Sequence, residues 1–241
     1  GGSIGSEICR QVLRFAPRRL LLVEQAENAL FLVEQELSRL DPKPAFEPLV
    51  ADITDAQRME QIFAAYHPEV VFHAAAHKHV PMMEWNPAEA IKNNVFGTRQ
   101  LVILAARYGV REFVAISTDK AVNRTSDMGE SVKIVDLARD MIALSGLEPD
   151  DIEIVYTGLR PGEKLYEELY FEDERRVSTK HPKVFCAMHR PADLAAVEAT
   201  LHDLTEVIDE SPEVVRARLH DLVPEYAAAS PAEESPKARV K

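Results

Sequence analysis

Short apolar runs alternate with longer segments of helical periodicity along the first half of the chain. Four of these runs have the length and composition of buried strands, namely residues 19–24 (RLLLVE), 46–50 (FEPLV), 69–73 (EVVFH) and 112–117 (EFVAIS). Residues 28–40 instead carry Leu30, Val33 and Leu37 at intervals of three and four, as on one face of a helix. Strands that alternate with helices indicate a parallel sheet covered by helices, so the sequence predicts an α/β fold.

Further helices are predicted from periodicity and from end signals. Residues 7–15 read as a helix, and Asp55 is placed to cap another helix that ends near residue 66. Pro87 suits the first turn of a long helix that reaches Tyr108, because proline is tolerated there. Residues 74–86 lie between these elements as a loop bounded by prolines.

The alternation of strands and helices ends near residue 120. Residues 121–131 (AVNRTSDMGES) are a polar connector. The later segments with a readable pattern are a helix at 132–145, a strand at 152–156, a helix at 163–170, and two helices within 191–222 that separate near residue 212. From residue 224 the sequence is rich in Ala, Pro, Glu and Lys, which predicts a disordered tail.

A sheet of this class usually has about six parallel strands, whereas only four are readable before residue 120. A strand is expected directly before residue 1, and further strands are expected between residues 123 and 127. We therefore predict an incomplete sheet.

Composition narrows the classes of partner. The formal net charge is −12, whereas proteins that bind nucleic acids carry basic surfaces, so no nucleic-acid partner is expected. Cys9 and Cys186 are too few and too far apart for a disulfide framework, which suits a reducing cytoplasm. No apolar run approaches the roughly 20 residues that span a bilayer, so this sequence is expected to be soluble.

The first residues carry the pattern of a phosphate-binding loop. The sequence GGSIGSE opens a helix, and its candidate cofactor-binding residues are Gly2, Ser3, Ile4 and Gly5. Glycines let the backbone approach a pyrophosphate, and the helix N-terminus favours the anion. Glu24 ends the next strand, where a carboxylate can bind an adenosine ribose and favour NAD over NADP. The alternative is a flexible N-terminus and a carboxylate that merely ends a strand in solvent.

Polar residues also follow the later strands. Asp52 is placed to meet an adenine amino group, although the pattern by itself favours a simple capping turn. His73, His77 and His79 raise the idea of a metal, but no cysteine or carboxylate accompanies them in a ligand pattern, so none is predicted. The STDK run at residues 117–120 follows a strand, at the edge where open α/β sheets bind ligands.

These motifs resemble those of a known family. The runs GGSIGSE, DITD, FHAAAHKHVPMMEWNPAEAIKNNVFGT, FVAISTDKAVN, VKIVDLARDMI and TGLRPGEKLYEEL are similar to those of the polysaccharide-biosynthesis sugar-nucleotide dehydratases. These are extended short-chain dehydrogenase/reductase enzymes that act as UDP-N-acetylglucosamine 4,6-dehydratases. The resemblance covers residues 1 to about 222.

The resemblance implies a domain plan and a site. Residues 1–122 would form a Rossmann-like NAD(P)-binding part, 123–190 a remnant of the sugar-nucleotide-binding part, 191–223 C-terminal helices and 224–241 the tail. The cofactor would be NAD or NADP and the substrate a UDP-N-acetylhexosamine. Besides the glycine loop, the implied cofactor-binding residues are Glu24, Asp52, Ile53, Ala74, Ala75, Lys78, Asn93 and Ser117, and the implied substrate-binding residues are His79, Arg160 and Glu163.

The implied reaction moves a hydride from C4 of the sugar, eliminates the C6 hydroxyl and returns the hydride to C6. In this scheme Lys120 removes the C5 proton, Asp119 protonates the leaving hydroxyl, and Thr118 polarises the C4 oxygen. An adjacent acid and base are chemically reasonable, because their surroundings can tune both pKa values.

The sequence departs from the family in one internal region. Asn123 passes through residues 124–126 straight to Asp127, so the YxxxK-type segment that would bind the nicotinamide ribose is missing. Either the sequence omits segments of a longer protein, or the gene is deleted and the chain is an inactive relative or binding module. A 4-epimerase is a further alternative. Long family members carry membrane helices ahead of the catalytic part, so this chain would be cytoplasmic or the cytoplasmic part of an anchored protein, and a homo-oligomer is compatible with the family.

Overall fold

The computed structural model describes residues 1–40, 45–116, 139, 141–142, 144, 154, 175–178, 185–188 and 192–223. The chain divides into two compact units, one of residues 1–117 with 194–223 and one of residues 118–193 with 224–241. Everything that bears on the candidate site below lies in the first unit.

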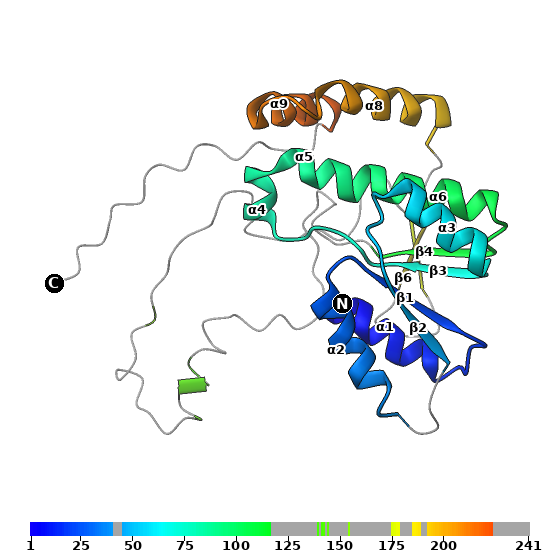
Figure 1. The fold of residues 1–241 in the computed structure, drawn as a ribbon. Helices are drawn as coiled ribbons and strands as arrows, with labels where there is room; N and C mark the ends of the chain where they lie inside the picture. Colours follow the sequence, from blue (N-terminus) through cyan, green and yellow to red (C-terminus); the bar gives the residue numbers. More distant parts are fainter. Residues whose placement is uncertain are drawn as a thin grey trace. The chain divides into compact units, whose positions relative to one another are not determined.

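The first unit opens with a parallel strand pair. β1 (Leu20–Glu24) pairs with β2 (Phe46–Val50) in a register that sets Leu20 opposite Phe46 and Glu24 opposite Val50. α1 (Ser3–Leu13) and α2 (Glu27–Leu37) pack against this pair (Figure 1). The apolar side of α2 packs on β1 and buries Leu30, Val33 and Leu37.

A second parallel pair follows in the same unit. β3 (Val70–His73) pairs with β4 (Glu112–Ala115), and α3 (Ala56–Tyr66) packs beside α6 (Thr98–Arg107). Asp55 caps α3 as the sequence predicts, since its side chain accepts a hydrogen bond of 2.9 Å from the backbone N–H of Arg58. Across the described residues, β1 and β3 share no hydrogen bond, so the unit holds two two-stranded sheets.

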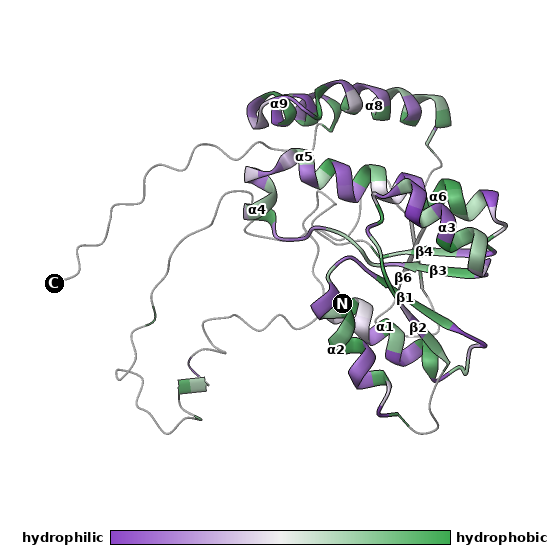
Figure 2. Cartoon of the chain, in the orientation of Figure 1, coloured by the Kyte–Doolittle hydropathy of each residue, from purple (hydrophilic) through white to green (hydrophobic). Residues whose placement is uncertain are grey.

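The main core lies among α3, α6 and the strands. Its fully or nearly buried side chains include Met59, Ile62, Phe63, Leu101 and Leu104, and the partly buried Val71 and Phe113 of β3 and β4 pack against it. The strands of this unit are largely apolar, whereas its helices carry both apolar and polar positions, as Figure 2 shows by hydropathy. This distribution is what a sheet between helices requires.

A third apolar cluster joins the C-terminal helices to the same unit. α8 (Leu194–Val207) packs beside α9 (Pro212–Leu222), which packs on α5 (Pro87–Ala90), and Ile91, Leu204 and Val215 are buried in one cluster. The two C-terminal helices and their break near residue 212 are thus confirmed.

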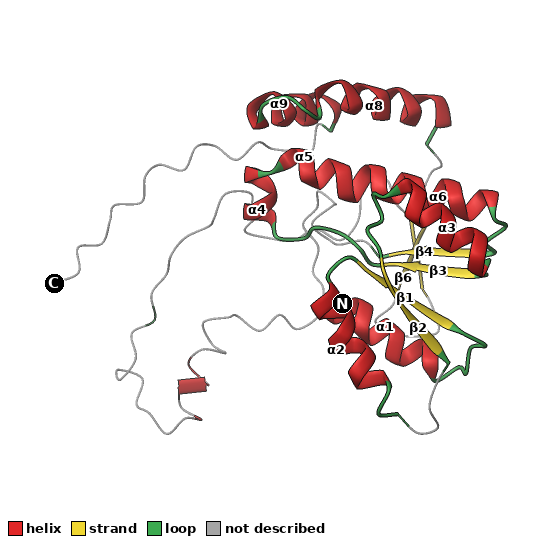
Figure 3. Ribbon diagram, viewed as in Figure 1, coloured by secondary structure: helices red, strands yellow, loops and turns green. Residues whose placement is uncertain are grey.

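Figure 3 shows the observed helices and strands, several of which differ from the predicted ones. α1 begins at Ser3 rather than at residue 7, and α4 (Val80–Trp85) forms in a segment predicted as a loop. The long helix after Pro87 is interrupted by a π-helical stretch, η1 (Ile91–Gly97), before α6 continues it. Among the described residues of the second unit, β5 (Arg175–Ser178) and β6 (Phe185–Met188) form an antiparallel pair that the pattern did not indicate.

The remaining predicted elements are described only in part. Residues 139, 141, 142 and 144, within the helix predicted at 132–145, are helical. The strand predicted at 152–156, apart from residue 154, lies outside the described residues, as do the helix at 163–170 and the tail from 224. Within the described ranges, no helix combines the length and the apolarity needed to cross a bilayer.

Candidate functional site

The glycine loop lies at the start of α1, next to the carboxyl end of β1. Gly2 is the N-cap residue of α1 and offers no side chain to its first turn. A Cβ on Gly1 would lie 2.3 Å from the Cβ of Ala29, so only glycine fits at that position. Gly2 and Gly5 instead face open space, and a Cβ added to either would have no heavy atom within 4 Å. The backbone of the loop is therefore accessible to a ligand, and the helix N-terminus favours an anionic one.

Glu24 brings a carboxylate to the same place. Its Oε2 lies beside Gly1, and its Oε1 accepts a hydrogen bond of 3.0 Å from the N–H of Ala26. A carboxylate therefore lies beside the glycine loop, as the strand–loop–helix pattern predicts.

The segment after β2 contributes a tight turn. Asp52 Oδ1 accepts hydrogen bonds of 2.8 Å from both the backbone N–H and the hydroxyl of Thr54, so this oxygen stabilises its own turn. Ile53 is buried, and a Cβ on Gly97 would lie only 2.7 Å from its Cδ1. The side chain of Ile53 belongs to the core, which leaves only its backbone for the cofactor contact that the resemblance implies.

His73 ends β3 and is buried, with 8% of its surface exposed. Its Nε2 forms a hydrogen bond of 2.7 Å with Thr98 Oγ1, and its ring packs on Phe113. Burial lowers the pKa of His73, so the neutral imidazole is the stable form. The small residues that follow, Ala74 and Ala75, are exposed and leave the backbone of the strand end open.

Two asparagines of η1 hold the loop that follows β3. The side-chain amide of Asn94 accepts from the N–H of His77 at 2.8 Å and donates to the carbonyl of His77 at 3.0 Å. The buried Asn93 donates to Asn94 Oδ1 at 2.9 Å and, more weakly, to the carbonyl of Ala75 at 3.4 Å. The sequence pointed to Asn93 but missed Asn94. A signal was present, because consecutive asparagines are unfavourable inside a helix unless their side chains have partners.

We expect Asn94→Ala to loosen the loop at residues 74–79 and to lower the free energy of unfolding by about 1–3 kcal/mol, because two partly buried backbone groups lose their partner. Hydrogen exchange of the His77 amide and urea unfolding measure the two effects. Asn86→Ala is the matched control, since the Asn86 side chain donates to the exposed carbonyl of Met82 within the same short segment. Equal changes in both variants would contradict a specific role for Asn94.

The lowered pKa of His73 predicts a pH dependence of stability. The unfolded chain binds a proton on this residue below about pH 6.5, whereas the folded chain resists protonation there. The contribution of His73 to the free energy of unfolding is therefore fully present above that pH. It decreases as the pH falls further, until the pKa of His73 in the folded state is reached. We expect the free energy of unfolding, measured in urea, to decrease as the pH falls from about 7.5 to about 5.5. The His73→Gln variant should show a smaller decrease over the same range. His202→Gln, at an exposed position of α8, is the control; an unchanged slope in His73→Gln would contradict the account.

The other predicted site residues divide into two groups. Lys78 and His79 are exposed, and His79 is the N-cap residue of α4, whose carbonyl accepts the first two helical hydrogen bonds. Ser117, Thr118, Asp119, Lys120, Arg160 and Glu163 lie outside the described residues. Within the described part of the chain, no three His, Cys, Asp or Glu side chains are grouped closely enough to hold a metal ion.

The described geometry defines the class of the first unit. Parallel strands alternate with helices, a glycine-opened helix begins beside a strand end, and a carboxylate ends the following strand, which is the arrangement of Rossmann-type α/β proteins. The chain matches the polysaccharide biosynthesis protein family over residues 1–129 and 124–189, and it belongs to that family.

Relatives of known name support this membership. The chain is 33% identical over 276 residues to the capsular polysaccharide biosynthesis protein CapD of Staphylococcus aureus, covering 77% of this chain and 46% of the relative. It is 32% identical over 330 residues to the probable polysaccharide biosynthesis protein EpsC of Bacillus subtilis, covering 100% and 54%. It is also 32% identical over 123 residues to an inverting UDP-N-acetylglucosamine 4,6-dehydratase of Campylobacter jejuni, covering 51% and 35%.

The lengths of these matches show that the chain corresponds to only part of each relative. The chain spans about half the length of the two polysaccharide biosynthesis relatives. The alignment with EpsC covers 330 residues although this chain has 241, so the relative carries internal residues that this chain lacks. The two family matches also meet at residues 124–129, where the sequence predicts the internal gap.

Proposed function

We propose that the first unit binds a nicotinamide dinucleotide at the carboxyl ends of β1, β2 and β3. One observation carries this proposal, namely the Glu24 carboxylate beside the open glycine loop at the start of α1. The loop and the helix N-terminus suit a pyrophosphate, and the carboxylate suits the hydroxyl groups of a ribose.

The same carboxylate favours NAD over NADP. An anionic group at the ribose position accepts hydrogen bonds from free hydroxyls, whereas it repels a 2′-phosphate. The exposed Ala74 and Ala75 leave room for the dinucleotide at the end of β3, and the Asn94–His77 hydrogen bonds fix the backbone that follows. These residues therefore fit the cofactor.

We further propose that the protein is an NAD-dependent 4,6-dehydratase of a UDP-N-acetylhexosamine that acts in polysaccharide biosynthesis. The support is the family membership, together with the similarity to the dehydratase of Campylobacter jejuni across half of this chain. The bound nicotinamide supplies the hydride chemistry. Lys120 is proposed to remove the C5 proton, Asp119 to protonate the departing C6 hydroxyl, and Thr118 to hold the C4 oxygen.

The substrate diphosphate and ribose are assigned to Arg160 and Glu163, with His79 near the sugar. Arginine suits a diphosphate because its planar guanidinium forms paired hydrogen bonds with phosphate oxygens. The cytoplasm, where NAD and nucleotide sugars are found, is the proposed place of action.

The test is incubation of the full chain with NAD and UDP-N-acetylglucosamine, followed by mass spectrometry of the nucleotide sugar. A dehydratase yields a product lighter by one water, and an epimerase yields an isomer of unchanged mass. The aligned residues that this chain lacks favour one alternative, a chain that binds NAD without turning over the sugar. Saturable NAD binding with no product would establish that alternative and would contradict the dehydratase proposal for this chain.

A further inference from the structure

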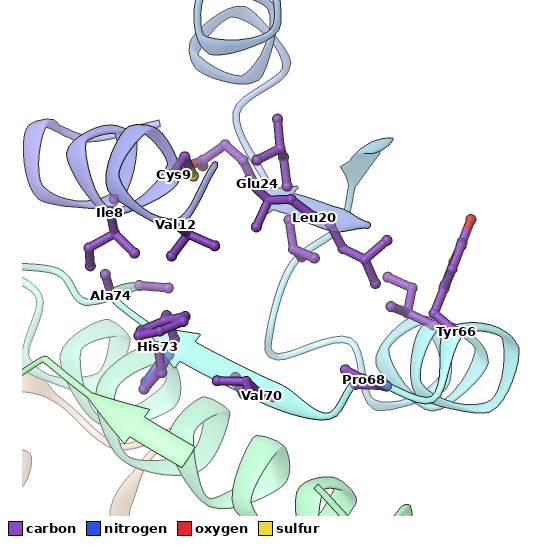
Figure 4. Close-up of a pocket in the computed structure, with 18 of the residues that line it drawn as sticks. Ile8, Cys9, Val12, Leu20, Glu24, Tyr66, Pro68, Val70, His73 and Ala74 are labelled. Atoms are coloured by element: carbon purple, nitrogen blue, oxygen red, sulfur yellow. The ribbon is translucent and has the colours of Figure 1, made fainter. Parts of the chain in front are cut away.

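The loop at residues 74–79, between β3 and α4, lies at the candidate nucleotide site. Ala74 and Ala75 line the same cavity as Gly2 and Glu24. Figure 4 shows Ala74 at the end of β3 and Glu24 at the end of β1, across this cavity from each other. The conformation of the loop therefore decides whether the end of β3 and the glycine loop present one surface to a ligand.

The short helix α4, which follows this loop, is not stable by itself. It has six residues, none of its side chains is buried, and Met82 and Trp85 are 53% and 69% exposed. An isolated helix of this length does not persist in water, because its few internal hydrogen bonds do not offset the conformational order that they require. The position of α4 therefore depends on contacts with neighbouring elements.

One such contact comes from the C-terminal helices. Arg216 of α9 donates a hydrogen bond of 2.6 Å from Nη1 to the backbone carbonyl of Glu84, in the last turn of α4 and 132 positions earlier in the sequence. The last carbonyls of a helix lack partners within the helix, and a basic side chain can supply them. The Arg216 side chain is only 27% exposed, and its Nη2 lies 3.1 Å from a carboxylate oxygen of Glu213, so two partners hold the guanidinium.

The helix that carries this arginine is anchored on the element that holds the loop itself. Val215 of α9 has no exposed surface and lies in one apolar cluster with Ile91 of η1. In turn, η1 carries Asn94, whose amide binds the backbone N–H and carbonyl of His77. The loop and α4 are thus held at two points, by η1 and by α9, which share one core.

We propose that Arg216 is a positioning residue of the nucleotide site. By holding the last turn of α4, it keeps the loop at residues 74–79 in the conformation to which the dinucleotide binds. Without this support the loop populates other conformations, and the apparent affinity decreases in proportion to the fraction that remains competent to bind. The identity of the ligand rests on the proposed function, whereas the support of α4 rests on the hydrogen bond from Arg216.

The experiment compares the original full chain with three variants, Arg216→Ala, Arg216→Lys and Arg218→Ala. Lysine can donate to the Glu84 carbonyl but lacks the second arm of the guanidinium, so it is the conservative replacement. Arg218 lies on the same helix and pairs with Asp203 of α8 at 2.9 Å, so its removal disturbs the C-terminal helices through a contact that does not involve α4. The readouts are hydrogen exchange of the amides of residues 76–86 without nucleotide, and calorimetric titration with NAD.

We expect Arg216→Ala to speed exchange across residues 76–86 by about 10-fold or more, with exchange in β1 and β2 unchanged. The same variant should bind NAD about 10-fold more weakly, and saturating NAD should restore the protection of residues 76–86. Arg216→Lys should recover most of both losses, and Arg218→Ala should match the original chain in both measurements.

Unchanged exchange in Arg216→Ala would overturn the proposal. Faster exchange with unchanged NAD affinity would also overturn it, because Arg216 would then stabilise α4 without positioning the site. Equal losses in Arg218→Ala would overturn it as well, since they would reflect a general loosening of the C-terminal helices. An original chain that binds no NAD would contradict the proposed function. The exchange comparison, which uses no nucleotide, then still decides whether Arg216 holds the loop.

Discussion

Lys120→Ala is expected to abolish dehydration of UDP-N-acetylglucosamine. The proposed reaction cannot proceed past a 4-keto sugar unless a base removes the C5 proton, and loss of a positioned general base typically costs about 10²–10⁴-fold in rate. A neighbouring acid, Asp119, cannot replace it without exchanging its own role. The measurement is the initial rate of appearance of the dehydrated nucleotide sugar at saturating substrate.

Lys92→Ala provides the matched control for this experiment. Lys92 is a partly exposed lysine of η1 whose amine lies 3.5 Å from Glu89 and 3.6 Å from Asp209. We expect this variant to keep its activity, and Lys120→Ala to keep its affinity for the nucleotide sugar. Turnover by Lys120→Ala at the original rate would show that another residue is the base.

Leu104→Ala is expected to destabilise the first unit by about 2–5 kcal/mol, as a fully buried leucine in a tight core does. Leu104 has no exposed surface, and it belongs to the cluster in which α6 packs with Phe63 of α3. A typical domain has only about 5–15 kcal/mol of stability, so this loss is large. Urea unfolding monitored by circular dichroism measures it.

Val102→Ala is the matched control, because it changes the same helix at a position outside the core. Val102 lies on the same helix but is 48% exposed, so its replacement should change stability by no more than about 0.5 kcal/mol. A loss of similar size in both variants would mean that α6 does not pack as described.

Local pattern was sufficient to locate the four parallel strands. Runs such as EVVFH are short, apolar and β-branched, and a segment of helical periodicity separates each run from the next, so type and order are readable without tertiary information. Asp55 was equally readable as a helix cap. Elements whose stability comes from tertiary contacts were not readable in this way.

The elements that the sequence did not predict depend on tertiary contacts or are too short to show a period. α4 contains a proline and two methionines in a six-residue helix, too short to show a period. The π-helical stretch η1 keeps the apolar pattern of an ordinary helix, and its irregularity accompanies the Asn93 and Asn94 contacts with the loop after β3. Strands β5 and β6 depend on pairing with each other.

The candidate site was partly predictable for a topological reason. Parallel strands place their carboxyl ends at one edge, so the glycine loop and Glu24 were expected together before any distance was known. The turn formed by Asp52 was one of the two explanations that the sequence offered for this residue. The burial of Ile53 was not predictable, because it depends on the packing of Gly97.

The central claim is a dinucleotide site built on Glu24 and the glycine loop, and calorimetric titration of the full chain with NAD tests it most directly. We expect saturable binding of NAD, weaker binding of NADP, and a loss of about 10-fold or more in NAD affinity for Glu24→Ala, because a hydrogen bond to a charged group contributes about 1.5–3 kcal/mol. Absence of saturable NAD binding, or equal affinity of the original chain and Glu24→Ala, would contradict the account.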